Sequence, residues 1–298
     1  MEKIPYSGEI MALAAALSWS FAVILFRKTG ETVPALALNI FKTLFSLILF
    51  TLTLVVMGAD FLPPLPRREY LIFLISGGIG IGLADTFFFM TLNRVGAGLQ
   101  SIITTSYSPS IILFSILFLD ERLTLVQFAG VVLILSAVLF VSKMGGRKNE
   151  LSRRTLVIGT VFGISAMIFT AISVVMVKPL LSGHSLIWVN WWRLLGGSVV
   201  GLLLLPLLPR RRQAIASLRN VRVWPVMIPG SFIGNYISLI LWLGGMKYTQ
   251  VSNASVLNQT STIWTFLLAA LLLKEPVTWK RLLGLALGLG GVALVTFG

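Results

Sequence analysis

The sequence predicts an all-α integral membrane protein with ten transmembrane helices, arranged as two inverted five-helix repeats. The first observation is composition, because 56% of the 298 residues are hydrophobic and only 11% are charged, whereas an ordinary soluble domain has roughly 25% charged residues. The second observation is a series of long apolar runs that are separated by short polar connections. The third is that the second half of the chain resembles the first at a nearly constant offset.

Ten apolar runs are each long enough to cross a bilayer, which takes a helix of about 20 residues. Short connections with Pro, Gly or charged residues separate them, such as 63–68 and 210–212. The first run follows an N-terminus with little positive charge and no evident cleavage site, so we expect it to be retained. The expected helices cover residues 7–27, 36–57, 70–92, 97–118, 124–142, 155–177, 186–207, 223–246, 252–273 and 279–297.

The longest polar stretch falls at the middle of the chain. Residues 143–154 are rich in Gly, Lys and Arg, which is typical of a linker between two units. We therefore expect a first five-helix repeat over residues 1–142 and a second over residues 155–298, joined by a cytoplasmic linker over residues 143–154.

Polar residues recur at matching positions in the two halves. With an offset of 154 residues, Glu121 matches Glu275. Earlier in the chain the offset is 151 residues, so that Lys42 matches Arg193. Because each half has an odd number of spans, the second half must enter the membrane from the opposite side, which predicts an inverted repeat.

The distribution of Lys and Arg predicts the orientation in the membrane. Connections on the side of the chain termini hold 6 of these residues, and connections on the other side hold 16. Positive charge concentrates on the cytoplasmic side of membrane proteins. We therefore expect both termini to lie outside the cytoplasm.

The composition argues against several classes of function. The chain has no Cys and a single His, His184, so a His/Cys metal site is not expected. The formal charge of +14 comes mostly from the connections, and we interpret it as a topology signal rather than a nucleic-acid surface. The sequence has no Gly-x4-Gly-Lys-Ser/Thr motif, so we do not expect ATP hydrolysis or a bound cofactor.

The last run contains small residues that suit either close packing between helices or the face of a weak homodimer. The chain is accordingly expected to be a monomer or a weak homodimer. These small residues are Gly284, Gly288, Gly290 and Gly291.

Polar residues form a stripe along one helix face in each half, because positions i, i+3, i+4 and i+7 share a face of an α-helix. The first stripe consists of Ser101, Thr104, Thr105 and Ser108. The second stripe, 154 residues later, consists of Ser255, Asn258, Gln259 and Thr262. Polar side chains in hydrocarbon need partners or water, so we expect the two stripes to face inward and to line a substrate-binding cavity. The alternative is hydrogen bonding between packed helices.

Two features favour a cavity over helix packing alone. Asn258 and Gln259 each have two N–H donors and an acceptor, which is more capacity than packing usually needs. Pro109 has no N–H, so we expect the carbonyl of Thr105 to lack its helical partner and to be exposed on the stripe.

Asp85 lies in the middle of the third apolar run. An intramembrane carboxylate costs roughly 2.5 to 3.5 kcal/mol on insertion and suggests a functional site. One interpretation is a titratable residue that couples transport to proton movement. The alternative is an ion pair with Lys42 that neutralises both groups. The repeat equivalent of Asp85 is Leu239, so either role would be asymmetric.

Lys42 and Arg193 each follow an Asn by three residues, namely Asn39 and Asn190. A cation at this place could attract an anionic substrate, or its long side chain could reach the membrane surface. Each Asn is expected to bond to backbone or to a neighbouring helix. Aromatic residues that could form the apolar walls of the cavity are Trp19, Tyr107, Tyr236 and Trp242.

These motifs resemble those of the drug/metabolite transporter superfamily, and most closely those of its EamA family. Shared features are the Ser-Trp-Ser element at 18–20, the acidic turns at 119–121 and 273–276, and a Thr-x5-Gly after each turn. The similarity covers nearly the whole chain, although Phe169 and Thr170 replace the Ser18-Trp19 pair in the second half. The resemblance implies a carrier of the prokaryotic inner membrane with a central cavity between its halves, often an exporter of amino acids or other small metabolites.

We therefore expect a secondary transporter rather than an enzyme. It would export a small amino acid-like or otherwise amphipathic metabolite across the inner membrane by alternating access, with its termini in the periplasm. The expected substrate-binding residues are Trp19 and the two stripes, and the expected charge or coupling residues are Asp85 and Lys42. The expected partners are a small-molecule substrate and the lipid bilayer, without nucleic acid.

Two alternatives stay open. A flippase for lipids or lipid-linked glycans would differ in having a cavity that opens sideways to the bilayer. An integral-membrane enzyme is disfavoured because the apolar runs contain no paired carboxylates and no metal-ligand spacing.

Overall fold

The computed structural model describes residues 6–119, 124–143, 151–208, 210–249 and 251–297, and this part of the chain forms helices and turns without a β-strand. The first half contains α1 (Ser7–Thr29), α2 (Ala35–Val56), α3 (Arg67–Gly77), α4 (Asp85–Val95), α5 (Ala97–Thr104), α6 (Tyr107–Leu119) and α7 (Leu125–Ser142). The second half contains α8 (Arg153–Val177), α9 (Leu186–Leu204), α10 (Arg211–Leu218), α11 (Trp224–Ser231), α12 (Ser238–Tyr248), α13 (Val251–Leu272) and α14 (Trp279–Phe297). Shorter helical segments are η1 (Gly78–Ala84), η2 (Lys178–Gly183), η3 (Leu205–Leu207), η4 (Val221–Val223) and η5 (Phe232–Ile237).

Several helical segments are long and apolar enough to cross a membrane. Among the described residues these are Ser7–Thr29, Ala35–Val56, Arg67–Val95, Arg153–Gly183, Leu186–Leu207 and Val221–Tyr248, and Leu125–Val141 is a shorter apolar helix. Their outer faces suit lipid, because on α2 the apolar side chains of Ile48, Leu52 and Val55 recur at helical spacing and are more than half exposed. The predicted all-α membrane class is confirmed.

Both halves have a π-helical segment at the corresponding place. The segment η1 joins α3 to α4, and η5 joins α11 to α12, so that their first residues, Gly78 and Phe232, are 154 positions apart. A π-turn leaves some backbone carbonyls without their usual helical partner. In η1 the side chain of Asn39 supplies partners, because its Nδ2 donates to the carbonyls of Ile81 at 2.8 Å and Gly82 at 3.1 Å. This confirms the expected role of Asn39.

The apolar run at 97–118 is not one continuous helix, because it breaks between α5 and α6 at residues 105 and 106. Pro109 cannot donate to the carbonyl of Thr105, and the chain instead makes a tighter turn in which Ser108 N donates to that carbonyl at 3.1 Å. The prediction of a free Thr105 carbonyl was therefore wrong. The break changes the helical phase between the two ends of the first stripe.

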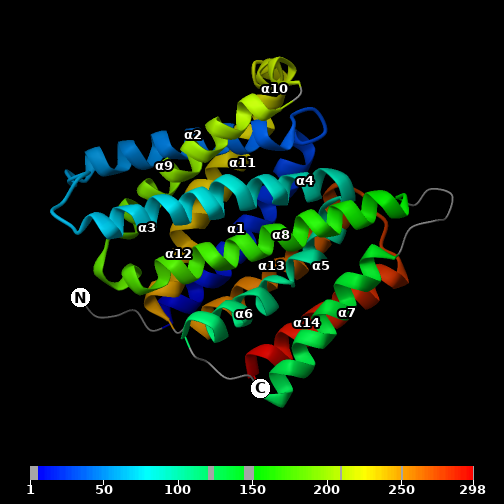
Figure 1. The fold of residues 1–298 in the computed structure, drawn as a ribbon. Coiled ribbons are helices and arrows are strands. Elements are labelled where there is room, and N and C mark those ends of the chain that lie inside the picture. Colours follow the sequence, from blue (N-terminus) through cyan, green and yellow to red (C-terminus); the bar gives the residue numbers. More distant parts are fainter. Residues whose placement is uncertain (1–5, 120–123, 144–150, 209, 250, 298) are drawn as a thin grey trace.

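The first helix of each half packs against helices of the other half. Helix α1 of the first half packs against α12 and α13 of the second, and α8 of the second half packs against η1, α4 and α6 of the first. In Figure 1, α12 and α13 run next to α1. Residues far apart in the sequence are therefore brought together at the centre of the molecule.

The last helices of the two halves, α7 and α14, pack against each other more extensively than any other pair. They lie side by side and run in opposite directions at one edge of the bundle (Figure 1). The packing is close, because a Cβ at Gly291 would lie 2.6 Å from Ile134 Cγ1 and 2.7 Å from the Gly130 carbonyl oxygen. Gly291 thus serves helix packing within the chain.

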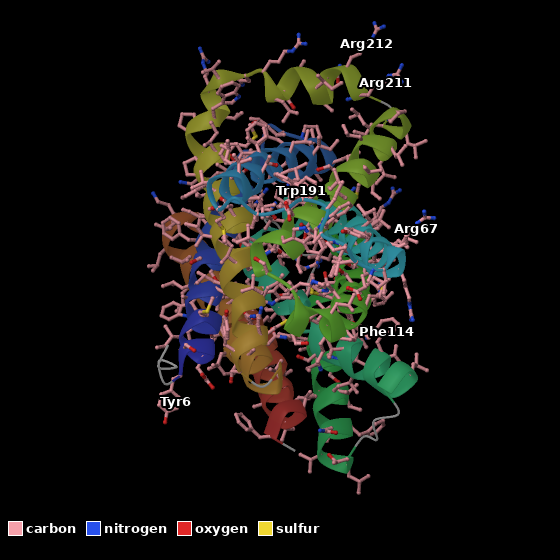
Figure 2. The ribbon with its side chains drawn as sticks, turned by 90° about the vertical axis from the view of Figure 1, so that its left-hand side faces the viewer. Tyr6, Arg67, Phe114, Trp191, Arg211 and Arg212 are labelled. Atoms are coloured by element: carbon pink, nitrogen blue, oxygen red, sulfur yellow. The ribbon has the colours of Figure 1, made fainter. Side chains whose placement is uncertain are left out.

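The polar connection that includes residues 210–212 contains a short helix, α10, which the sequence analysis did not predict. Figure 2 shows Arg211 and Arg212 on α10 pointing away from the helix bundle. Tyr6, the first described residue, and the last turn of α14 both lie far from α10 (Figures 1 and 2). The basic residues of α10 therefore lie at one end of the bundle, away from Tyr6 and from the end of α14.

Candidate functional site

A cavity lies at the centre of the bundle, where helices of both halves meet. The cavity has a volume of about 210 Å³. Its walls come from α1, η1, α4, α5, α6, α8, α9, η5, α12 and α13. The apolar wall residues include Ala15, Ala16, Val23, Ile81, Phe88, Met167, Leu239 and Met246. The polar wall residues are Asp85, Gln100, Ser101, Thr104, Tyr107, Thr170, Arg193, Asn235, Ser238, Asn258, Gln259, Ser261 and Thr265, with the indoles of Trp19 and Trp242 beside them.

The cavity gathers most of the residues that the sequence singled out. Those that line it are Trp19, Asp85, Ser101, Thr104, Asn258 and Gln259. Four others are not among the lining residues: Lys42, Thr105 and Thr262 are buried in the protein interior, and Ser108 is partly buried. The side chain of Ser255 lies outside the described residues.

Wall residues occur in pairs that are related by the offsets found in the sequence. An offset of 154 residues relates Phe88 to Trp242, Thr104 to Asn258, Tyr107 to Ser261 and Asp85 to Leu239. An offset of 151 residues relates Ala16 to Met167 and Trp19 to Thr170. Equivalent positions of the two halves therefore face the same space, even where the residue types differ.

The first stripe splits between the cavity and the protein interior. Ser101 and Thr104 line the cavity, and their hydroxyls donate to the backbone carbonyls of Gly98 and Ser101 at 2.9 and 2.6 Å. Thr105 is fully buried beside α14, where a Cβ at Gly288 would lie 3.1 Å from its methyl carbon. The helix break at residues 105 and 106 explains why one stripe does not present all its members to one space.

The second stripe connects the two halves. Gln259 Nε2 donates to Ser108 Oγ at 3.0 Å, so the two stripes meet directly. Asn258 lies between α1 and α12, where its carboxamide accepts from Trp242 Nε1 at 2.9 Å and donates to the Ala12 carbonyl at 3.3 Å, in the orientation that satisfies both groups. Thr262 is buried, and its hydroxyl has no hydrogen-bond partner in the described part of the chain.

Lys42 and Asp85 form an ion pair at the cavity wall. Lys42 Nζ lies 2.6 Å from Asp85 Oδ2, with the lysine side chain fully buried and the carboxylate 21% exposed. Lys42 Nζ also donates to Asn235 Oδ1 at 3.0 Å. The neutralising pair that the sequence analysis gave as an alternative is therefore present, and Asp85 keeps one side on the cavity.

Arg193 is the second cation of the site. Its side chain is only 2% exposed and lines the cavity, so it does not extend to the membrane surface. Nη2 donates to Ser173 Oγ at 3.0 Å, while Nε and Nη1 have no hydrogen-bond partner among the described residues. Asn190, three residues earlier, has no hydrogen-bond partner for either polar side-chain atom within the described ranges, so the expectation that it bonds to backbone or to a neighbouring helix was wrong.

Several wall residues were missed by the sequence analysis. Gln100 directly precedes the first stripe, and Asn235 corresponds to Ile81 in the repeat, so neither stood out by symmetry. Both polar atoms of the buried Gln100 side chain, and the hydroxyl of Tyr107, lack a hydrogen-bond partner among the described residues. A Gln inside an apolar run was the one available signal for Gln100.

Aromatic rings form part of the wall. The Trp19 and Phe88 ring centroids are 5.5 Å apart, and the Trp242 ring lies 5.9 Å from Arg193 Cζ. Of the four aromatic candidates, Trp19, Tyr107 and Trp242 line the cavity, whereas Tyr236 lies outside it and bonds Thr53 Oγ1 at 2.6 Å.

The arrangement suits the binding of a small solute that has a polar head and an apolar body. The wall combines the guanidinium of Arg193 and several uncharged polar groups with apolar side chains, which is typical of sites for small molecules. Among the described residues, no group of three or more His, Cys, Asp or Glu side chains is placed to hold a metal ion.

Comparison with known proteins finds relatives that are named as transporters. An uncharacterized transporter of Archaeoglobus fulgidus is 22% identical over 286 residues, which covers 93% of this chain and 93% of the relative. The uncharacterized transporter YetK of Bacillus subtilis is 22% identical over 289 residues, covering 96% of this chain and 86% of the relative. Both relatives therefore match the chain along nearly its whole length.

A crystal structure with 18% sequence identity superposes with a TM-score of 0.68, covering 98% of this chain and 96% of the other, which shows the same fold. The sequence profile of the EamA-like transporter family matches residues 6–143 and again residues 157–297. Together the two matches span almost the entire chain. The chain belongs to the EamA-like transporter family.

Proposed function

We propose that this protein is a secondary transporter that exports a small amphipathic metabolite, amino acid-like or similar in size, across the cell inner membrane. The observation that supports this most is the central cavity, because equivalent positions from both halves line it. A site between two related halves is typical of carriers that work by alternating access, in which one half moves against the other. The direction of export follows from the family resemblance.

The architecture that we propose is ten spans in two inverted five-helix repeats, over residues 1–142 and 155–298. The two family matches, the π-helical segments η1 and η5, and the paired wall residues support this division. With five spans in each half, the two halves would be related by an axis in the membrane plane. The linker 143–154 and the basic helix α10 would then lie in the cytoplasm, and both termini in the periplasm.

Transport fits the site better than catalysis does. The carboxylate that lines the cavity, Asp85, is paired with Lys42 and is therefore a poor general base. We further propose that the chain acts as a monomer or weak homodimer, without nucleic acid. Asp85 remains our candidate for coupling to a proton gradient, because it is the carboxylate among the described wall residues and is 21% exposed.

The experiment is uptake of labelled amino acids, organic acids and amines into proteoliposomes that contain the purified protein, with and without a pH gradient. We expect at least one solute class to accumulate above liposomes that contain heat-denatured protein. The variant Gln259→Leu removes a polar wall group and its bond to Ser108, and should slow uptake roughly tenfold. The control Leu271→Ala, on the exposed face of the same helix, should transport as the wild type does.

The coupling role has its own variant in the same assay. Asp85→Asn keeps the shape of the side chain and removes its titration. It should bind solute but lose the response to the pH gradient. Transport that stays fully gradient-driven in Asp85→Asn would exclude Asp85 as the coupling residue, and equal uptake by wild type and Gln259→Leu would argue against the cavity as the binding site.

A further inference from the structure

The cavity wall has an uncompensated positive charge at Arg193. The charged groups at the site, among the described residues, are two cations, Lys42 and Arg193, and one carboxylate, Asp85. Lys42 Nζ forms an ion pair with Asp85 Oδ2 at 2.6 Å, whereas the guanidinium of Arg193 forms no ion pair within the described residues. A buried charge in a low-dielectric interior requires a partner, so one further negative charge would neutralise the site.

The guanidinium is held in place from several sides. Ser173 Oγ accepts from Nη2 at 3.0 Å and itself donates to the Ser76 carbonyl at 2.7 Å, so its lone pair is directed at Arg193. The Trp242 ring lies 5.9 Å from Cζ and adds a cation–π contact. A side chain that is fixed in this way loses little conformational freedom when a ligand binds.

Further buried polar groups face the same cavity without partners. Gln100 is fully buried, and its Nε2 and Oε1 have no hydrogen-bond partner among the described residues. The buried hydroxyl oxygen of Tyr107 also has no hydrogen-bond partner among the described residues, and both Gln100 and Tyr107 line the cavity. Buried polar groups in proteins are normally satisfied, so the unpaired donors on α5, α6 and α9 indicate a ligand that supplies acceptors.

We propose that the cavity binds an organic monoanion whose carboxylate is held by Arg193, with Tyr107 and Gln100 as further donors; this inference rests on the proposed transporter function. The planar guanidinium offers several N–H donors that match the geometry of a carboxylate. A monoanion neutralises the site, whereas a zwitterion or a cation leaves it charged. A phosphate monoester has close to two negative charges, so its binding would give the site a net negative charge.

The test compares probes that share one skeleton and differ in charge. These are hydrocinnamate, its neutral amide hydrocinnamamide, zwitterionic phenylalanine and cationic phenethylamine, with inorganic phosphate as a second oxyanion. Binding to the full-length protein in lipid nanodiscs is measured by calorimetry, and transport of each probe is measured in proteoliposomes. We expect hydrocinnamate to bind roughly tenfold to a hundredfold more tightly than the amide, because hydrogen bonds to a charged group are the stronger ones.

Variants test whether the preference for hydrocinnamate over its amide depends on Arg193. Arg193→Gln should bind hydrocinnamate and the amide equally, and Arg193→Lys should keep part of the preference because it keeps the charge. Should Arg193→Gln fail to fold, Tyr107→Phe removes only one hydroxyl and should weaken hydrocinnamate roughly tenfold while leaving the amide unchanged. The matched control is Arg222→Gln, an exposed arginine outside the cavity, which should behave as the wild type does.

The outcomes separate the anion site from the transporter function. Equal binding of the acid and the amide, binding of neither, tighter binding of phosphate, or an unchanged preference in Arg193→Gln would overturn the anion site. Transport of phenethylamine or hydrocinnamamide that is independent of Arg193 would also overturn it and leave the transporter function standing. Binding of hydrocinnamate through Arg193, without transport of any probe, would support the anion site and contradict the transporter function.

Discussion

The Lys42–Asp85 pair explains how the membrane interior tolerates a buried lysine. Lys42 Nζ is bonded to Asp85 Oδ2 at 2.6 Å and to Asn235 Oδ1 at 3.0 Å, and its side chain is fully buried. Removing one member of such a pair leaves an uncompensated charge, whereas replacing both by apolar residues is often neutral. The pair is therefore a sensitive point for stability.

We predict that Asp85→Leu lowers the free energy of unfolding by about 3 kcal/mol, at the lower end of the range for broken buried pairs, because the Lys42 ammonium loses its counter-charge. Lys42→Met should cost less, since Asp85 keeps contact with the cavity. The double variant should recover most of the loss. Unfolding in a detergent titration measures all three, and additive effects of the two single variants would show that the charges do not interact.

At the residue scale, sequence patterns found the polar stripes but not all of the site. Helical spacing placed Ser101 and Thr104 correctly, yet it could not show that Thr105 turns toward α14 after the helix break. Arg193 matched Lys42 in the repeat, but periodicity could not separate a side chain at the cavity from one that reaches the membrane surface. That distinction depends on Trp242, from another helix, and on Ser173.

At the element scale, the acidic turn after α13 caps a helix of the other half. Glu275 accepts from Ala97 N at 2.7 Å and from Gly98 N at 3.1 Å, and Arg281 Nη1 lies 3.3 Å from its Oε2. A carboxylate at a helix N-terminus bonds free N–H groups and complements the helix dipole. Gly96 at φ +84° makes the approach possible, because a Cβ there would lie 2.6 Å from Glu275 Oε1.

We predict that Glu275→Ala lowers the free energy of unfolding by about 1–2 kcal/mol, because the first N–H groups of α5 lose their acceptor. The control Glu31→Ala removes an exposed carboxylate and should change stability by less than about 0.5 kcal/mol. Thermal unfolding in one detergent compares the two variants. Equal effects would contradict a capping role for Glu275.

The helices themselves were largely predictable, and their exceptions have local causes. The apolar runs coincide with helices because hydrocarbon requires every backbone group to bond internally. Pro109 divides the run at 97–118, and α10 forms within a connection that is rich in arginine. The acidic turn motif was recognised in both halves, but its partner at Ala97 is 178 residues away from Glu275, and Glu121 lies outside the described residues.

At the scale of the whole molecule, the sequence predicted two related halves but not how they interlock. The offset of 154 residues relates Phe88 to Trp242 and Thr104 to Asn258, and both pairs line one cavity. The packing of α1 and of α8, each against helices of the opposite half, could not be predicted from either half alone, because the contacts join residues that are far apart in the chain. The cavity forms where these helices of the two halves meet.

The orientation is testable because the chain has no cysteine. We predict that Asp60→Cys, in the exposed α2–α3 connection, reacts with an impermeant maleimide from the periplasmic side. Arg212→Cys, on α10, should react only from the cytoplasmic side or after the membrane is opened. A reversed pattern would contradict the orientation, and labelling of both from one side would contradict the proposed number of spans.

The central claim is that the cavity between the halves is the transport pathway. Thr104→Cys places a single thiol on its wall, in a chain that has no other. The measurement is solute uptake into proteoliposomes before and after modification with a bulky methanethiosulfonate, with complete modification verified by mass spectrometry. We predict that modified Thr104→Cys loses uptake while modified Asp60→Cys keeps it, and full uptake by completely modified Thr104→Cys would contradict the claim.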